Sequence, residues 1–182
     1  LYLNSSLGYS LLRLEHNSLT SNYNTLATQN ALLQSEYNQL RYQINQRSQH
    51  YNASNFITPN DSSVDQIVTE ITGGWSNPSN WDEFWDDLKA MYEWVVNNVD
   101  YRYDGLFPLL PNELSGDAEY NDEMWQLPNE TLNLRKGDCE DMAILLCSMI
   151  LHYTDGEYWT ECITLAGSNS GHMGVQIPVA KG

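Results

Sequence analysis

The chain has 182 residues, 41% of them hydrophobic and 12% aromatic, which suits one globular domain of modest size with an appendage. Its formal net charge of -16 argues against nucleic acid and anionic membrane surfaces as partners, because both require a basic face. No apolar run approaches the ~18 residues that a membrane-spanning helix needs.

The chain begins at Leu1 rather than Met, and no signal-like segment follows. We therefore expect that a segment upstream of Leu1 was removed or left out. Four sequons favour an exported glycoprotein, and they stand at Asn4, Asn52, Asn60 and Asn129. The expected location is extracellular or at the cell surface, with any membrane anchor upstream of Leu1.

Residues 1–52 are predicted to form a coiled-coil helix. Leucine recurs at every seventh residue, which is position d, and Asn30 is a polar residue at position a. The period of 3.5 indicates a left-handed supercoil, and a single Asn at a is typical of two parallel strands. We expect a homodimer, with a helix folded back on its own domain as the alternative. The predicted coiled-coil core is Leu12, Leu19, Leu26, Asn30, Leu33 and Leu40.

Residues 53–63 lack periodicity and are predicted to be a linker. A short helix is expected at 64–71, ended by a pair of glycines. The clearest helical pattern of the globular part runs over 81–99, where apolar residues recur at i, i+3, i+4 and i+7. We interpret its aromatic stripe as one buried face.

Residues 100–129 are predicted to be a long irregular excursion rich in acids. Between Asp61 and Glu130 there are 16 acidic residues, against only Lys89 and Arg102. A solvated acidic surface is the favoured interpretation, so no cofactor is expected. Calcium is the weaker alternative, because hard cations bind clustered carboxylates, although the spacing matches no EF-hand loop. The calcium candidates are Asp117, Glu119, Asp122 and Glu123.

Residues 139–152 are apolar nearly all round, which predicts a central buried helix. Residues 158–166 and 172–179 alternate in polarity, which predicts an antiparallel hairpin. The chain has three cysteines, and an odd number in an exported chain suggests one pair and one free thiol. Cys147 and Cys162 are the possible disulfide, since the helix should pack on the next strand. Two reduced core cysteines are the alternative.

Cys139 is predicted to lie in the first turn of the central helix, where free N–H groups and the helix dipole favour a thiolate. Glu140 and Asp141 oppose this effect, so a base is needed to hold the thiolate as an ion pair. His172 begins the last predicted strand and is the candidate base. On spacing alone, an inert core cysteine and a surface histidine remain the more ordinary interpretation.

The segment from Trp125 to Leu145 resembles the nucleophile motif of the transglutaminase-like superfamily, particularly its archaeal and bacterial cysteine-protease branch. The motif reads Arg, any residue, Gly, any residue, Cys, an acidic pair, any residue and Ala. The run from Asn98 to Asp104 is similar to the family's approach to this motif, and the strand starting at Gly171 is similar to its histidine strand. The matching motif residues are Arg135, Gly137, Cys139, Glu140, Asp141 and Ala143.

The resemblance implies an α+β fold in which a central helix packs on an antiparallel sheet, and a catalytic triad of Cys, His and Asp. The resemblance covers about 82–179, and we place the domain at 64–182. The ten residues after His172 include no Asp or Glu, so either the chain stops before the third residue and the last strands or the protein lacks them. Without that partner the orientation of the imidazole is not fixed. Trp125, Gln126 and the N–H of Cys139 are candidate oxyanion donors.

Two functions follow. The first is cysteine-dependent acyl transfer on peptide or glutamine amides, by a thiol protease or a transamidase, with a protein or peptide substrate. The second is a non-catalytic cell-surface structural or interaction protein that combines the same scaffold with coiled-coil assembly. Rapid labelling of Cys139 by a thiol reagent at neutral pH would favour the enzyme.

Overall fold

The computed structural model describes residues 2–49, 52–77, 80–167 and 171–177. The chain divides into two compact units, one of Leu1–Asn45 with Leu110–Ala118 and the other of Gln46–Leu109 with Glu119–Gly182. None of the described helices has both the length and the hydropathy to cross a membrane. The mixture of helices with small sheets is α+β, as expected.

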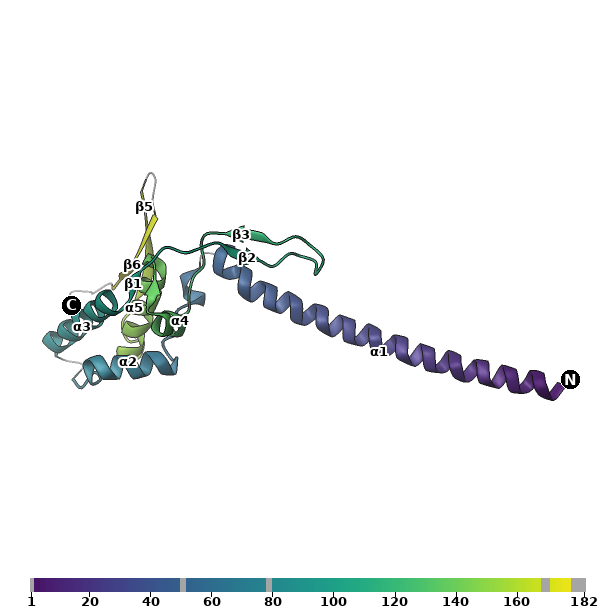
Figure 1. Cartoon of the computed structure of the whole chain (residues 1–182). Helices are drawn as coiled ribbons and strands as arrows, with labels where there is room; N and C mark the ends of the chain where they lie inside the picture. The colour runs from purple at the N-terminus through teal and green to yellow at the C-terminus, as the bar shows by residue number, and fades with distance from the viewer. Residues whose placement is uncertain (1, 50–51, 78–79, 168–170, 178–182) are drawn as a thin grey trace. The chain divides into compact units, whose positions relative to one another are not determined.

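The first unit is dominated by α1 (Tyr2–Gln49), a long helix whose C-terminal turn belongs to the second unit (Figure 1). Tyr37 Oη donates a hydrogen bond to the carbonyl oxygen of Pro111 at 2.7 Å. Asn45 accepts from the N–H of Leu110 and donates to its carbonyl, at 2.9 and 2.8 Å. Most of the stretch 1–52 is thus helical, and its assembly as a coiled coil stays a prediction. Its leucines at position d are between 49% and 70% exposed, and they are Leu12, Leu19, Leu26, Leu33 and Leu40.

The second unit is built around α5 (Cys139–Tyr153), which contacts α2 (Ser62–Thr72), α3 (Trp81–Asn98), α4 (Pro128–Leu134) and a β-hairpin (Figure 1). The hairpin pairs β5 (Glu161–Ala166) with β6 (Gly171–Gln176) in antiparallel register. Because α5 is apolar nearly all round, it can bury side chains against each of these neighbours. Its start is thereby held at a defined position.

The buried face of α3 is narrower than its apolar pattern predicts. Phe84, Met91 and Val95 are at most 2% exposed and pack in the same core as residues of α5. Trp81 and Trp85, in contrast, are each 47% exposed. The expectation of one fully buried aromatic stripe is thus correct only for the residues nearest α5.

The stretch 53–63, expected to be a linker, is instead packed within the second unit. It contains a 3-10 helix at Ala53–Asn55, and the next residue, Phe56, is 2% exposed with its ring edge-on to Trp125. The N–H of Thr58 donates to Ser148 Oγ at 3.0 Å, which fixes the stretch to α5. Burial of Phe56 and this hydrogen bond explain why the stretch is ordered without any periodic pattern.

Two short strand pairs lie within and beside the excursion at 100–129. β1 (Asp100–Tyr101) pairs in parallel with β4 (Lys136–Gly137), and the N–H of Arg102 donates to the carbonyl of Gly137 at 2.9 Å. β2 (Phe107–Leu109) pairs with β3 (Glu119–Asn121) in antiparallel register. The first pair matters for the site, because it draws two distant segments together beside the start of α5.

Candidate active site

Cys139 is the first residue of α5 and is half-buried. Its Sγ lies 3.2 Å from Glu140 Oε2, a hydrogen-bonding distance for sulfur. The hydroxyl of Tyr101 also forms a hydrogen bond with the Cys139 thiol, because the pairing of Tyr101 with Gly137 places it beside the helix start. Cys139 therefore lies at the N-terminus of a helix, as expected.

His172 lies on β6 opposite Leu165 of β5 and is exposed. It lines a cavity of about 480 Å³ that Cys139 also lines. In the described part of the chain, the imidazole has no hydrogen-bond partner, so the expected ion pair with Cys139 is not formed here. The cavity is lined by Tyr101, Tyr103, Glu123, Trp125, Asp138, Cys139, Glu140, Thr164, Gly171, His172 and Met173.

The carboxyl group next to Cys139 is held in its neutral form. Burial is the first cause, and together with hydrogen bonds to Glu123, Asp138 and Cys139 it raises the pKa of Glu140 to about 11. Burial likewise raises the pKa of Asp138 above its ordinary value. A neutral Glu140 does not repel a thiolate, so the opposition expected from this residue is largely removed.

Burial is also the main cause of the raised pKa of two further groups near the start of α5. It raises the pKa of Asp104 to about 6, with smaller contributions from the charges of Asp138, Glu123 and Asp122. It raises the pKa of Tyr101 to about 12, followed by the charge of Cys139. The phenol is therefore a hydrogen-bond donor at neutral pH.

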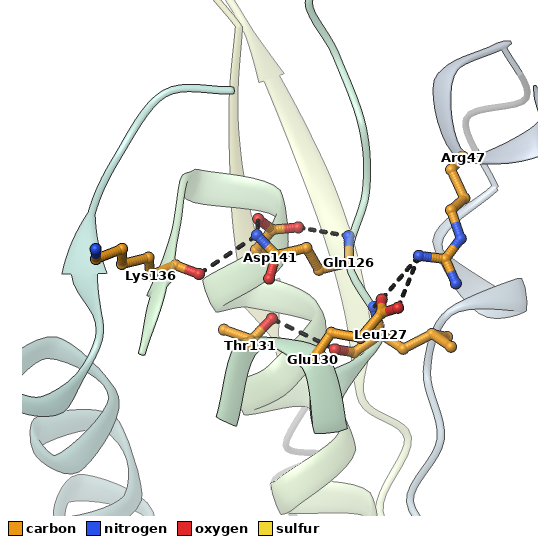
Figure 2. A network of polar contacts seen from close by, with 7 residues as sticks. All are labelled: Arg47, Gln126, Leu127, Glu130, Thr131, Lys136 and Asp141. Carbon is orange, nitrogen blue, oxygen red and sulfur yellow. Dashed lines mark hydrogen bonds and ion pairs between the residues drawn. The ribbon is translucent and has the colours of Figure 1, made fainter. Parts of the chain in front are cut away.

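Asp141 has a structural position rather than one in the cavity. Its carboxylate is fully buried and accepts from the N–H and the Nε2 of Gln126 at 2.7 and 2.6 Å (Figure 2). Gln126 Nε2 also donates to the carbonyl oxygen of Lys136 at 3.3 Å. Gln126 does not line the cavity of Cys139, and its side-chain donors are used by these contacts. Its expected role as an oxyanion donor therefore finds no geometric support.

Trp125, the other expected oxyanion donor, does line the cavity and is 4% exposed. Its indole Nε1 donates to Glu123 Oε1 at 2.9 Å, and its backbone N–H donates to the carbonyl of Arg47 at 3.0 Å. Both donors thus have acceptors within the protein. The N–H of Cys139 remains available by position, because the first N–H groups of a helix have no partner within it.

Gly137 and Arg135 of the motif have clear backbone roles. A Cβ on Gly137 would lie 2.6 Å from Cβ of Asp141, so only glycine fits there. Arg135 ends α4 in the left-handed conformation with φ 54, and its guanidinium stacks over the ring of Trp94 at 4.5 Å. Gly137 and Arg135 therefore set the backbone path that leads to Cys139, and neither lines the cavity.

The four calcium candidates do not gather in the described part of the chain. Asp117, Glu119 and Asp122 are exposed, and Glu123 alone lines the cavity. The group of carboxyls close enough to share an ion consists instead of Asp104, Asp138 and Glu140. Sequence spacing did not indicate it, because Asp104 reaches the other two only through the pairing of β1 with β4.

Cys147 and Cys162 are brought together as expected, but the structure has all three cysteines as free thiols. The Cys147 S–H forms a hydrogen bond with Cys162, which lowers the pKa of Cys162 and raises that of Cys147. Neither residue lines the cavity of Cys139. Cys162 lines a second cavity of about 420 Å³, beside Trp159 and Thr160.

Tyr101 and Tyr103 line the cavity but had no predicted role. The signal was present in the run from Asn98 to Asp104, which resembled the family without pointing to particular side chains. Their approach to Cys139 depends on β1, a strand of two residues that no periodic pattern marks.

A comparison with protein-family models matches residues 79–181 to the transglutaminase-like domain. The chain belongs to the transglutaminase-like family. The matched segment contains α3, α4, α5 and the hairpin, and hence both Cys139 and His172. Comparisons with curated proteins and with solved structures gave no match. The resemblance noted in the sequence is thereby confirmed, and membership of the transglutaminase-like family makes cysteine-based chemistry the first function to consider.

Proposed function

We propose that the chain catalyses acyl transfer on peptide or glutamine amides, with Cys139 as nucleophile and His172 as proton carrier. The observation that supports this most is that both side chains line one cavity of about 480 Å³. The position of Cys139 at the start of a buried helix adds to it, because the helix dipole stabilises a thiolate there.

In the proposed reaction, His172 accepts the thiol proton as Sγ of Cys139 attacks the amide carbonyl carbon. The tetrahedral intermediate collapses when His172 returns the proton to the leaving nitrogen, and a thioester remains. Water or a primary amine then attacks the thioester, and His172 takes a proton from the attacking group. His172 gives this proton to the departing sulfur of Cys139, which restores the thiol and the free imidazole. The enzyme is a protease when water attacks and a transamidase when the amine attacks.

The developing oxyanion needs hydrogen-bond donors beside the N-terminus of α5. The N–H of Cys139 is one by position, and the hydroxyl of Tyr101 is a second, since it already reaches the thiol. Among the described residues, no carboxylate or amide orients His172. We therefore expect slow turnover from the chain as it stands, because an unoriented imidazole transfers protons poorly.

Alkylation of the full chain by iodoacetamide tests the nucleophile. Cys139 should react faster at neutral pH than a free thiol, and His172→Ala should remove that excess. His152→Ala is the matched control, since His152 contacts Pro59 and Asp65 outside the cavity. Equal rates in wild type and His172→Ala, or a Cys139 slower than Cys162, would reject the proposal. Peptide mapping by mass spectrometry assigns each labelled cysteine.

The second candidate is a non-catalytic surface protein assembled through α1. The exposed leucines of the d series support it, because such a stripe is ordinarily covered by another helix. In this proposal the chain is a homodimer at the cell surface. Slow labelling of Cys139 together with a dimer in solution would favour it over the enzyme.

A further inference from the structure

A row of large apolar side chains on α3 stays about half exposed in the described part of the chain. Trp81, Trp85, Tyr92 and Val96 are 47%, 47%, 55% and 49% exposed. They are spaced by four, seven and four residues, which places them on one line along the helix. α3 packs on α2 and α5 through the adjacent line of buried residues (Figure 1). Scattered apolar residues are ordinary on a surface, whereas an aligned row of this kind marks an interaction site.

A second row, made of acids, runs beside this exposed row. Three of the four apolar residues are followed directly by an exposed acid, and these acids are Asp82, Asp86 and Glu93. Successive residues of a helix are rotated by about 100°, so the acids form a line parallel to the exposed row. Lys89 is the one basic residue of α3 and pairs with Glu93 at 3.7 Å. The ion pairs between described residues include neither Asp82 nor Asp86, so both carboxylates are free to meet a cation.

The two tryptophans of the exposed row are held in position by the core. The ring of Trp81 packs edge-on against Phe84 and Tyr158, with ring centroids 5.5 and 5.9 Å away. The ring of Trp85 packs edge-on against Phe84 at 5.2 Å. Because Phe84 is 1% exposed, these contacts fix part of each indole while the rest stays in water. A partner that covers the row therefore loses little affinity to the ordering of these side chains.

The charges on this face decide between the possible occupants. A second copy that presented the same face would bring acids against acids, which is unfavourable. An anionic membrane surface is repelled for the same reason. An apolar row bordered by acids is complementary to an amphipathic helix that carries apolar residues beside Lys or Arg. α3 has 18 residues and is therefore about 27 Å long, which is enough to pair with such a helix over several turns.

We infer that this face of α3 docks a basic amphipathic helix of a partner protein. The apolar side of that helix covers the exposed row, and its Lys or Arg side chains lie against Asp82, Asp86 and Glu93. The described residues that line the cavity of Cys139 include none from α3. The inferred surface is thus separate from the proposed active site, and it does not depend on catalysis there.

Binding of a fluorescein-labelled peptide to the full chain, followed by fluorescence anisotropy, is the direct test. The probe is a helical peptide of Leu and Lys, as long as α3, with Leu on one face. We expect saturable binding of one peptide per chain. Tyr92→Ser should weaken binding by about tenfold or more, as is usual for an aromatic residue at the centre of an interface. Tyr120→Ser is the matched control, because Tyr120 is 66% exposed but lies on β3, and it should bind as wild type does.

A second pair of variants tests the charges. Asp86→Asn should weaken binding and make it less sensitive to salt, because it removes a carboxylate that faces the peptide. Asp117→Asn removes the same charge from an exposed position outside α3, and it should leave the affinity unchanged. A twin peptide with Glu in place of every Lys should not bind.

Three results would overturn the inference. Equal effects of Tyr92→Ser and Tyr120→Ser would mean that the net charge alone attracts the peptide. A lower mass of Tyr92→Ser than of wild type in light scattering would assign the face to a second copy. Sedimentation of the chain with neutral phosphatidylcholine vesicles, lost in Tyr92→Ser, would assign it to a membrane. Circular dichroism checks that each variant folds, and the twin peptide tests the inference on wild type alone.

Discussion

Gly137 and Asp141 occupy adjoining space at the start of α5. The Asp141 carboxylate cannot move aside, since Gln126 holds both of its oxygens, and a Cβ on Gly137 would also lie 2.8 Å from Oδ2. The spacing between these two motif residues thus has a steric reason that is independent of chemistry in the cavity. One more carbon atom at Gly137 must displace either the helix start or this hydrogen-bonded side chain.

Gly137→Ala is therefore expected to lower the free energy of unfolding by about 1–3 kcal/mol, the usual range for overpacking. Gly105→Ala is the control, because a Cβ there meets nothing within 4 Å. Urea denaturation of the two variants beside wild type measures the difference. An unchanged midpoint for Gly137→Ala would mean that Asp141 is not held as the structure has it.

The raised pKa values predict greater stability in mild acid than in mild alkali. In the folded chain they are about 6 for Asp104, about 7 for Asp141 and about 11 for Glu140, with burial as the first cause in each case. Because the folded pKa values exceed the unfolded ones, the folded chain binds more protons, and unfolding releases them. The stability from Asp104 and Asp141 is full below about pH 4 and is lost as the pH rises through 6 to 7.

Urea denaturation between pH 5 and pH 8, in EDTA, measures this slope. The midpoint should fall as the pH rises, and Asp104→Asn should make the fall shallower, since it removes one of the titrating groups. The charges that raise the pKa of Asp104 are those of Asp138, Glu123 and Asp122, and they act in the same direction as burial. A midpoint that rises with pH would contradict the prediction.

At the scale of elements, the long helices followed from periodicity alone. The patterns over 81–99 and 139–152 predict α3 and α5 to within a residue at each end. α4 was missed because its seven residues are too few for a periodic pattern. Its signal was Pro128 in the first turn and Glu130, whose Oε2 accepts from the N–H of Leu127 at 2.8 Å while also binding Arg47 (Figure 2).

Contacts between distant segments were beyond prediction. Phe56 is ordered by Trp125, and Asp104 meets Asp138 through β1 and β4, and no local pattern marks either contact. Cys139 and His172, in contrast, were singled out by resemblance to a family motif, and the structure has them lining one cavity. Hydrophobic periodicity thus predicted the helices, and the family resemblance predicted the pair of Cys139 and His172. The cluster of carboxyl groups could be found only in the three-dimensional structure.

The contact between α5 and β5 predicts a disulfide between Cys147 and Cys162 under oxidising conditions. The thiolate of Cys162 attacks oxidised glutathione and releases one glutathione thiol, and Cys147 then attacks the mixed disulfide and releases the second. The bond should stabilise the chain by about 3 kcal/mol, the value for a loop of this length.

Alkylation in denaturant without reductant should then label Cys139 alone, whereas labelling of all three cysteines would refute the pair. Cys162→Ser should abolish the gain in stability.

At the scale of the whole molecule, the exposed leucines of α1 predict a homodimer. Leu26→Glu places a charge in the d series and should convert the dimer to a monomer, because a buried unpaired charge is strongly unfavourable. Leu32→Glu is the matched control, since Leu32 is 60% exposed but lies outside the a and d series. Light scattering of the full chain gives the mass of each, and a monomeric wild type would rule out the coiled coil.

The parallel pairing of β1 with β4 also has a kinetic consequence. Its partners Asp100 and Lys136 are 36 positions apart, so this contact closes a long loop, whereas α5 needs only local contacts. We expect the helix to form early in folding and the loop to close late. Repulsion among the gathered acids then arises only at that last step, so it raises the barrier to loop closure while leaving the early helix untouched. Conditions that neutralise the acids should speed the final stage of folding, so the rate at which the cavity becomes complete depends on charge as well as on the length of the loop.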